Sequence, residues 1–309
     1  ASGEESEEEG PVISEEPPVF VRAIGTSGTG DGRFALPRDV AMTSDDSIYV
    51  ADTNNHRVQK FDPKDEFVWE IGAPGNRAQG SGDGAFNYPF SVTVAANGNF
   101  YVADKNNYRI QEFTSAGAFV RKWGSPGTDD GEFSNQSPRG VAVAPTVDGN
   151  VYVADTFNDR IQKFDKYGVF EREWGTEGTG DGEFNNPRGV AVASDGSVYV
   201  ADTQNSRIQK FDANGVFVTK WGAYGIGDGS FFQPRCVVVA SDSTVYVADT
   251  YNDRIQRFTS EGVFVSKWGT EGTGDGEFKD PRGVAVASNG NVYVTDYGNH
   301  RIQVFEYED

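Results

Sequence analysis

The feature that most constrains the fold is a short string repeated along the chain. Tyr-Val-(Ala/Thr)-Asp occurs six times, and the intervals between its aspartates are 52, 51, 47, 47 and 47 residues. Extra residues within 72–83 lengthen the first interval, and short insertions before Pro138 and Gly149 lengthen the second. A period near 47 residues, held over six copies, indicates one structural unit used repeatedly, as in a propeller or a solenoid.

Each repeat contains four short apolar runs. In the copy that begins at Trp174 these are GVAVA, VYVA, RIQKF and VFVTKW, and Gly, Asp, Asn or Ser bounds every run. Such runs, joined by turn pairs such as Asp195-Gly196, predict antiparallel strands. No segment keeps a 3.6-residue period, so we expect almost no helix. Four strands in about 47 residues are typical of one propeller blade, and alternating Val and Ala suits wedge-like packing around an axis.

The two ends of the chain predict how the ring closes. The last repeat stops after its third run, RIQVF, while residues 19–25 (VFVRAIG) resemble the fourth run of the other repeats. We therefore predict an all-β, six-bladed β-propeller with four antiparallel strands per blade, in which the N-terminal strand (about 19–25) completes the last blade. This pairing removes exposed sheet edges, which weighs against the alternative of an open solenoid.

The repeat resembles the NHL repeat family. The resemblance rests on GDGEF (180–184), PRGVAV (187–192), VYVADT (198–203) and NSRIQKF (205–211), and it covers roughly residues 19–305. It implies a propeller that binds proteins or RNA, often as one module of a larger chain. A related minority of members are enzymes, including the peptidylglycine alpha-amidating lyases.

Charge divides the chain into two predicted parts. The net charge is −20, and seven glutamates lie within residues 1–18, which contain no lysine or arginine, so residues 19–309 carry −13. We expect 1–18 to be a disordered acidic tail or linker and 19–309 to be a single propeller. An acidic body repels nucleic acid on average. No apolar stretch is long enough for membrane insertion. Acidity, a start at Ala1 and few Met and Cys favour a secreted or cell-surface protein, with the cytoplasm as the alternative.

An aspartate and an arginine flank the same four-residue hairpin loop in all six repeats. Antiparallel pairing places such residues opposite each other. They could form a ring of general acids or metal carboxylates, but a feature present in every blade favours structural ion pairs. The six pairs are Asp52 and Arg57, Asp104 and Arg109, Asp155 and Arg160, Asp202 and Arg207, Asp249 and Arg254, and Asp296 and Arg301.

Several further features recur in most repeats and favour a structural role. The hairpin asparagines (such as Asn205) suit turns. The Gly-Asp-Gly segments favour tight turns over calcium loops, which need several oxygen ligands. The aromatics of the fourth strand, such as Phe217 and Trp221, are expected to pack between blades near the rim.

Candidate binding residues lie where the copies differ. The residue after the repeat proline enters the innermost strand at the mouth of the central channel. It is phenylalanine in the second blade, Phe90, and arginine in the others: Arg38, Arg139, Arg188, Arg235 and Arg282. Five guanidiniums would form a positive ring suited to carboxylate or phosphate. The alternative is that each arginine pairs with an acidic residue of a nearby loop.

The hairpin loops are expected to open on the same face as this mouth. Their variable positions include Tyr108, Phe157 and Tyr251, which we predict to be exposed aromatics of the kind enriched in binding hot spots. The longer loop at 73–80 borders the same face, and a loop longer than its siblings is a candidate for recognition.

These features favour a non-enzymatic binding module that presents a variable loop face and an arginine-lined mouth to a protein or another acidic partner, with no cofactor and no metal. Three alternatives stay open: a structural or filament-forming repeat protein, a lyase- or hydrolase-like enzyme with a metal in the channel, and RNA binding. The chain has only two histidines, His56 and His300, which need a third ligand to form a zinc site. Its single cysteine, Cys236, excludes an intrachain disulfide.

Overall fold

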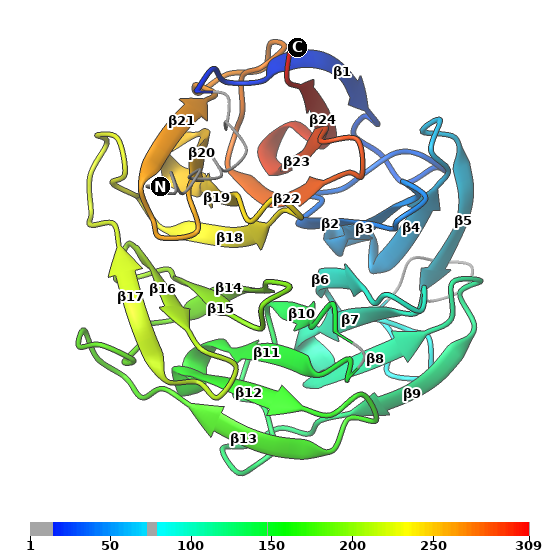
Figure 1. The fold of residues 1–309 in the computed structure, drawn as a ribbon. Helices are drawn as coiled ribbons and strands as arrows, with labels where there is room; N and C mark the ends of the chain where they lie inside the picture. The colour runs from blue at the N-terminus through cyan, green and yellow to red at the C-terminus, as the bar shows by residue number, and fades with distance from the viewer. Residues whose placement is uncertain (1–14, 73–78, 147, 309) are drawn as a thin grey trace, which may run out of the picture.

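In the computed structural model, which describes residues 15–72, 79–146 and 148–308, six four-stranded antiparallel sheets form a ring (Figure 1). The predicted six-bladed β-propeller is therefore confirmed. Residues 1–14, most of the predicted acidic tail, and 73–78, most of the longer loop, lie outside the described residues. No described helix is long and apolar enough to cross a membrane.

The first three blades follow one another in sequence. Blade 1 consists of β2 (Asp39–Met42), β3 (Ile48–Asp52), β4 (Arg57–Phe61) and β5 (Phe67–Gly72). Blade 2 consists of β6 (Pro89–Val94), β7 (Phe100–Asp104), β8 (Arg109–Phe113) and β9 (Phe119–Trp123). Blade 3 consists of β10 (Val141–Val143), β11 (Val151–Asp155), β12 (Arg160–Phe164) and β13 (Phe170–Trp174).

The remaining blades repeat this order. Blade 4 consists of β14 (Pro187–Val192), β15 (Val198–Asp202), β16 (Arg207–Phe211) and β17 (Phe217–Trp221). Blade 5 consists of β18 (Pro234–Val239), β19 (Val245–Asp249), β20 (Arg254–Phe258) and β21 (Phe264–Trp268). Blade 6 consists of β22 (Pro281–Val286), β23 (Val292–Asp296), β24 (Arg301–Glu306) and β1 (Val19–Ile24).

The N-terminal strand closes the ring as the sequence predicts. β1 pairs antiparallel with β24, with Val19 opposite Glu306 and Ile24 opposite Ile302. Figure 1 shows β1, in blue, beside the red β24. The first and last parts of the chain therefore share one sheet.

The hairpin between the second and third strands is tightly wound in every blade. In five blades it contains a single 3-10 turn, and these turns are η1 (Thr53–Asn55), η2 (Lys105–Asn107), η3 (Thr156–Asn158), η4 (Thr250–Asn252) and η5 (Tyr297–Asn299). Each turn ends in a residue of left-handed conformation, such as His56 at φ 55°. These turns are the helical content of the described chain, in line with the expectation of almost none.

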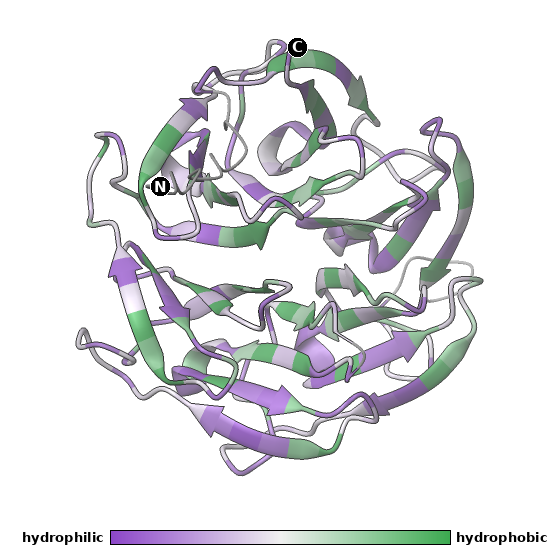
Figure 2. Ribbon diagram, in the orientation of Figure 1, coloured by the Kyte–Doolittle hydropathy of each residue, from purple (hydrophilic) through white to green (hydrophobic). Residues whose placement is uncertain are grey.

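The core lies between neighbouring blades, in six clusters. In the cluster between blades 3 and 4, the small side chains Ala142, Ala144 and Ala154 of one sheet face Val190, Val198, Val200 and Phe211 of the next. The blade 3 side also contributes Tyr152 and Ile161, so the small-against-bulky contact that the Val/Ala alternation predicts is limited to the three alanines. The outer strands are more polar, and Figure 2 shows much of β13 as hydrophilic.

Candidate functional site

The hairpin aspartate that recurs in all six repeats is the centre of a buried network, as blade 4 illustrates. Asp202 Oδ2 accepts hydrogen bonds from Arg207 Nε at 2.7 Å, Asn205 Nδ2 at 2.9 Å and Gln209 Nε2 at 3.1 Å. Its Oδ1 accepts one from the Asn185 N–H at 2.8 Å. Burial raises the pKa of Asp202, and these hydrogen bonds oppose that shift. All four acceptor bonds keep the carboxylate satisfied away from water.

The same network fastens the Gly-Asp-Gly turn to the blade. Arg207 donates to the carbonyls of Thr179, Gly180 and Glu183 at 2.7–2.8 Å. The Gly182 N–H donates to Gln209 Oε1 at 3.0 Å, and Gly182 has a φ of +79°, a left-handed conformation that favours glycine. The Gly-Asp-Gly segment thus takes part in a turn that the hairpin holds in place.

All six predicted Asp–Arg pairs occupy this position. The Arg Nε to Asp Oδ2 distance is 2.7–2.9 Å, and every one of these aspartates is fully buried. The members are Asp52–Arg57, Asp104–Arg109, Asp155–Arg160, Asp202–Arg207, Asp249–Arg254 and Asp296–Arg301. Their geometry holds each hairpin to the preceding inter-blade loop and leaves no free carboxylate oxygen for chemistry.

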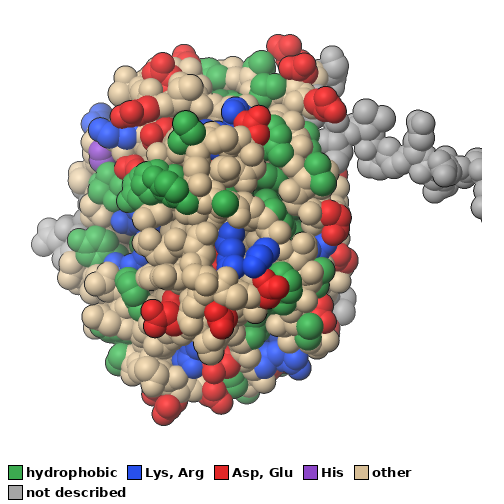
Figure 3. All heavy atoms as spheres, turned by 90° about the vertical axis from the view of Figure 1, so that its left-hand side faces the viewer, with side chains coloured by type: hydrophobic (Ala, Val, Ile, Leu, Met, Phe, Trp, Pro, Cys, Tyr) green, Lys and Arg blue, Asp and Glu red, His purple; other side chains and the backbone are tan. Residues whose placement is uncertain are grey.

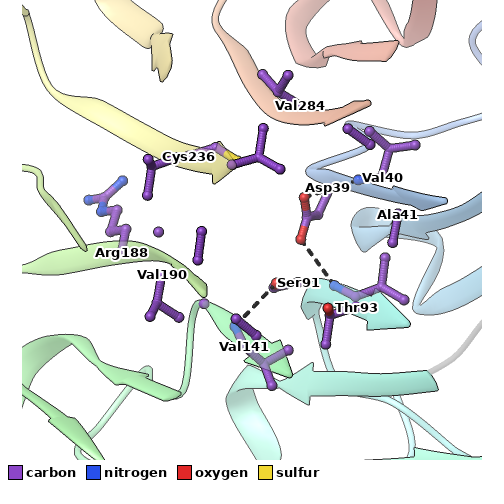
Figure 4. A pocket seen from close by; sticks show the side chains of 18 of the residues that line it. Asp39, Val40, Ala41, Ser91, Thr93, Val141, Arg188, Val190, Cys236 and Val284 are labelled. Atoms are coloured by element: carbon purple, nitrogen blue, oxygen red, sulfur yellow. Dashed lines mark hydrogen bonds between the residues drawn. The ribbon is translucent and has the colours of Figure 1, made fainter. Parts of the chain in front are cut away.

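The variable residues after the repeat proline gather around one opening. Arg38, Phe90, Arg139, Arg188, Arg235 and Arg282 all line a central cavity of about 300 Å³. The innermost strands carry them: each residue lies at or just before the start of β2, β6, β10, β14, β18 or β22. The side chain of Arg188 projects from its strand in Figure 4. The five arginines are called the mouth arginines below.

Four of the five mouth arginines contact aromatic rings. Arg38 lies 4.3 Å from the centre of the Phe90 ring and 4.8 Å from that of Tyr297. Arg139 lies over Phe90 and Phe157, Arg235 over Tyr251, and Arg282 over Tyr297. No ion pair among the described residues joins a mouth arginine to a carboxylate, although the charge of the loop residue Asp280 opposes the lowering of the pKa of Arg38 and of Arg282 by burial.

Burial beside like charges makes this arrangement electrostatically unfavourable. Desolvation lowers the pKa of Arg188 and Arg282, and the neighbouring mouth arginines lower it further. The pKa of Arg38 and that of Arg139 shift in the same direction for the same reasons. A guanidinium stays protonated at neutral pH even so, because its unperturbed pKa is very high. The mouth therefore holds crowded positive charge.

A lysine supplies the cation that blade 2 lacks, and the sequence reasoning missed it. Lys105 Nζ lies 5.8 Å from the centre of the Phe90 ring and 5.7 Å from that of Tyr88. Burial and the charges of Arg139, Arg38 and Arg188 lower the pKa of Lys105 to about 8. A signal was present: four other blades have threonine at this position, namely Thr53, Thr156, Thr203 and Thr250. Lys105 and the mouth arginines together are called the mouth cations.

Behind the mouth, the channel wall differs between blades. Asp39, Ser91 and Cys236 occupy one position, which is glycine in the other three blades. Figure 4 shows these side chains on strands that face the cavity. Asp39 accepts a hydrogen bond from the Val92 N–H at 3.1 Å, and burial raises its pKa to about 7. The far end is apolar, lined by Met42, Val94, Val143, Val192, Val239 and Val286.

Two of the three predicted loop aromatics are exposed. Phe157 and Tyr251 are 44% and 41% exposed, and each lies beside a mouth arginine. The prediction that Tyr108 is exposed is wrong, because its side chain is partly buried and its hydroxyl donates to Asn135 Oδ1 at 3.2 Å. The reason is its position: Tyr108 is the left-handed residue that ends η2, where side chains point toward the neighbouring blade.

The two histidines occupy this same left-handed position and act at separate blade junctions. His56 Nδ1 accepts a hydrogen bond from the Tyr88 N–H of blade 2 at 3.1 Å. His300 Nδ1 accepts one from the Leu36 N–H, which precedes blade 1, at 3.0 Å. Among described residues, no group of three or more His, Cys, Asp or Glu is placed to hold a metal.

Comparisons with known proteins agree with the repeat pattern. The NHL repeat model matches residues 34–61, 86–113, 184–211 and 278–305. Protein brain tumor of Drosophila melanogaster is 33% identical over 159 residues, which cover 51% of this chain and 14% of that protein. Peptidylglycine alpha-amidating monooxygenase of Rattus norvegicus is 32% identical over 142 residues, 44% of this chain and 14% of that protein. The match thus spans about a seventh of either relative.

Solved structures share the fold at low identity. A Bacteroides thetaiotaomicron protein of unknown function aligns with a TM-score of 0.71 and 17% identity, covering 93% of this chain and 76% of that one. A streptogramin B lyase aligns with a TM-score of 0.63 and 15% identity, covering 92% and 97%. At these identities the likeness shows the propeller fold alone.

Proposed function

We propose that this chain, an NHL-repeat β-propeller, is a non-enzymatic binding module that captures an acidic segment of a protein at the mouth of its channel. The observation that supports this most directly is the set of mouth cations. They crowd around one opening, and no ion pair to a described carboxylate neutralises the mouth arginines. The fold therefore holds the positive charges of the mouth cations close together despite their mutual repulsion.

An anionic partner relieves that repulsion. Arginine guanidiniums form paired hydrogen bonds with carboxylates, and such charge-assisted bonds are about twice as strong as neutral ones. The Nε atoms of Arg38, Arg188, Arg235 and Arg282 are buried without a hydrogen-bond partner in the described chain. Unpaired donors in a desolvated site favour a ligand that supplies acceptors.

The charge of the whole body favours an acidic protein segment over nucleic acid. Residues 19–309 carry a net charge of −13, which repels a long polyphosphate outside the mouth. A short acidic segment can place its carboxylates on the mouth cations while the rest of its chain stays away from the negatively charged propeller surface.

The residues behind the mouth support binding rather than chemistry. Burial and the neighbouring Asp39 raise the pKa of Cys236, which disfavours the thiolate that a nucleophile requires. Asp39 is engaged by the N–H groups of Val92 and Val40. We therefore assign the channel wall a structural role beneath a binding mouth.

The test measures binding of a fluorescent glutamate-rich 12-residue peptide by anisotropy. The site variant removes three mouth arginines: Arg188→Ala, Arg235→Ala and Arg282→Ala. The control removes three rim lysines that pair with exposed aspartates on the outside of the ring: Lys122→Ala, Lys220→Ala and Lys267→Ala. Both variants change the net charge equally, so only position distinguishes them.

We expect the site variant to lose about 100-fold or more in affinity, since several charged contacts disappear together, and the control to stay within about 3-fold. Melting curves confirm that both variants are folded. Equal weakening by both variants, or tighter binding of a single-stranded RNA of the same length than of the peptide, contradicts the proposal.

A further inference from the structure

One connection between blades departs from its siblings. Residues 222–233 join β17 to β18, and they carry Tyr224, Ile226 and Phe232. Where Tyr224 stands, other repeats have Ser27, Pro126, Glu177 and Glu271. Where Ile226 stands, they have Thr29, Ser81, Thr128, Thr179 and Thr273. Where Phe232 stands, they have Ala35, Asn87, Ser134, Asn185 and Lys279. Small or mostly polar positions are thus bulky and apolar in one copy.

These side chains are not part of the core. Tyr224 is 74% exposed and Ile226 is 81% exposed, the two highest values among the large hydrophobic residues of the described chain. Figure 3 looks at the edge of the ring that includes blades 4 and 5, and it shows hydrophobic side chains gathered in the left part of that view. The repeat folds without them elsewhere, so the fold does not require apolar residues at these positions.

The exposed residues lead to the mouth through aromatic contacts. The ring centres of Tyr224 and Phe232 are 5.2 Å apart, and those of Phe232 and Tyr251 are also 5.2 Å apart. The hydroxyl of Tyr251 accepts a hydrogen bond from Arg235 at 2.7 Å. We call Tyr224, Phe232 and Tyr251, with Ile226 beside them in the loop, the aromatic ladder. It joins an apolar surface to a mouth arginine without interruption.

We propose that the aromatic ladder binds the apolar part of a peptide whose acidic part binds to the mouth cations. The occupant is an extended protein segment with a cluster of carboxylates and, some residues away, an aromatic or other bulky apolar side chain. This inference rests on the proposed function and adds the second determinant that the partner must carry.

The geometry sets the spacing of that segment. The ladder spans three contacts of about 5 Å each between Tyr224 and the Arg235 guanidinium, a path of roughly 15 Å. An extended chain rises about 3.3 Å per residue, so the apolar side chain lies about four or five residues from the nearest carboxylate.

Charge and composition favour this occupant over a second copy of the chain. Aromatic residues next to arginine are the types that dominate protein-binding hot spots. Two copies of a body carrying −13 repel each other, whereas an acidic peptide is drawn to the mouth cations. An apolar side chain then gains contact area on the ladder, and the spacing determines which acidic segments fit.

The experiment compares two labelled 12-residue peptides. Both carry four glutamates, and one has a tryptophan four residues from the acidic cluster where the other has serine. The ladder variant replaces three residues by those of sibling repeats: Tyr224→Ser, Ile226→Thr and Phe232→Asn. The control variant replaces three valines that are 60–62% exposed, in turns on the opposite face of the ring: Val169→Thr, Val216→Thr and Val263→Thr.

For the unaltered protein we expect the tryptophan peptide to bind about 10-fold more tightly than the serine peptide. The ladder variant is expected to bind both peptides alike, at the affinity of the serine peptide, while the control variant keeps the 10-fold preference. If both peptides bind the unaltered protein equally, the ladder proposal is overturned and the mouth proposal stands. If neither peptide binds, the proposed function itself fails.

The chain's own N-terminal segment is the competing occupant. It contains glutamates together with Val12 and Ile13. A tryptophan preference that appears only after deletion of residues 1–14 would show that this segment covers the ladder, which overturns the assignment to an external partner. An unchanged preference after the deletion supports that assignment.

Discussion

Arg207 and Arg188 belong to the same blade, but their surroundings are opposite. Arg207 bonds the buried carboxylate of Asp202 and three backbone carbonyls, and the equivalent arginine of every other repeat bonds its aspartate and two or three carbonyls. Arg188 has neither a hydrogen bond nor an ion pair within the described chain, and other arginines are its main electrostatic neighbours. One site is complete in the folded protein, and the other is not.

This difference separates the requirements of the fold from those of binding. A buried charge is tolerated when its hydrogen bonds and its counter-charge are supplied, as they are in the hairpin network. Charges that stay together without such partners destabilise the fold slightly. Their arrangement is explained by an anion that arrives from outside.

The largest expected effect tests this contrast directly. Arg207→Ala leaves Asp202 buried without its cation and three carbonyls without a donor, so we expect the free energy of unfolding to fall by about 3–5 kcal/mol. The matched change Arg188→Ala removes only repulsion, and we expect a stability equal to or slightly above that of the unaltered protein. Urea denaturation measures both. Equal destabilisation by the two variants would remove the distinction between the sites.

The pH dependence of peptide binding sharpens the description of the mouth. The pKa of Lys105 is about 8, so its ammonium is charged at pH 7 and mostly neutral at pH 9. We expect affinity for the acidic peptide to fall by about 3- to 10-fold between these values, the loss of one partly desolvated ion pair. Lys105→Met is expected to bind weakly with little change over the same range, and a fall as steep as in the unaltered protein would assign the titration elsewhere.

Lys105 also affects the stability of the unbound protein. Its folded-state pKa lies below the usual 10.5, so between about pH 8 and 10.5 the unfolded chain binds more protons than the folded one. Its contribution to stability therefore rises with pH across that window. The unfolding free energy of the unaltered protein, minus that of Lys105→Met, is therefore expected to increase from about pH 8 to about pH 10.5.

The smallest expected effect concerns a junction between blades. Burial lowers the pKa of His56, and its Nδ1 accepts the Tyr88 N–H. Stability from this group is present above pH 6.5 and is lost as pH falls, because protonation of Nδ1 removes the acceptor. His56→Ser, the residue of the blade 4 sibling Ser206, is expected to cost about 1 kcal/mol at pH 7.5 and less at pH 5.5. A cost that grows on acidification would contradict this role.

Much of the fold and part of the site could be predicted from the sequence. The period of 47 residues, the four apolar runs and the unpaired strand at 19–25 predicted the blades and the closure, because strand pairing follows local pattern and the need to cover edges. The mouth arginines were found because they follow the repeat proline in five of six copies. Lys105 was missed because it lies in the hairpin loop, and only the pairing of β6 with β7, with Pro89 opposite Asp104, brings it beside Phe90 at the mouth.

The sequence by itself determined the repeated unit, its hairpin ion pairs and the place where the copies differ, since these depend on residues a few positions apart. Only the tertiary structure decided which variable residues meet. Tyr108 and Tyr251 occupy similar loops, yet one packs against a neighbouring blade and the other is exposed beside Arg235. Tyr224 joins Tyr251 through Phe232 because the loop before blade 5 packs against the hairpin of that blade, where the Tyr251 N–H donates to the Phe232 carbonyl. The Tyr108–Asn135 contact crosses from one repeat to the next, whereas the Tyr224–Phe232–Tyr251 contacts form within one repeat. Both depend on strand pairing and packing, which bring together positions that are far apart in the sequence.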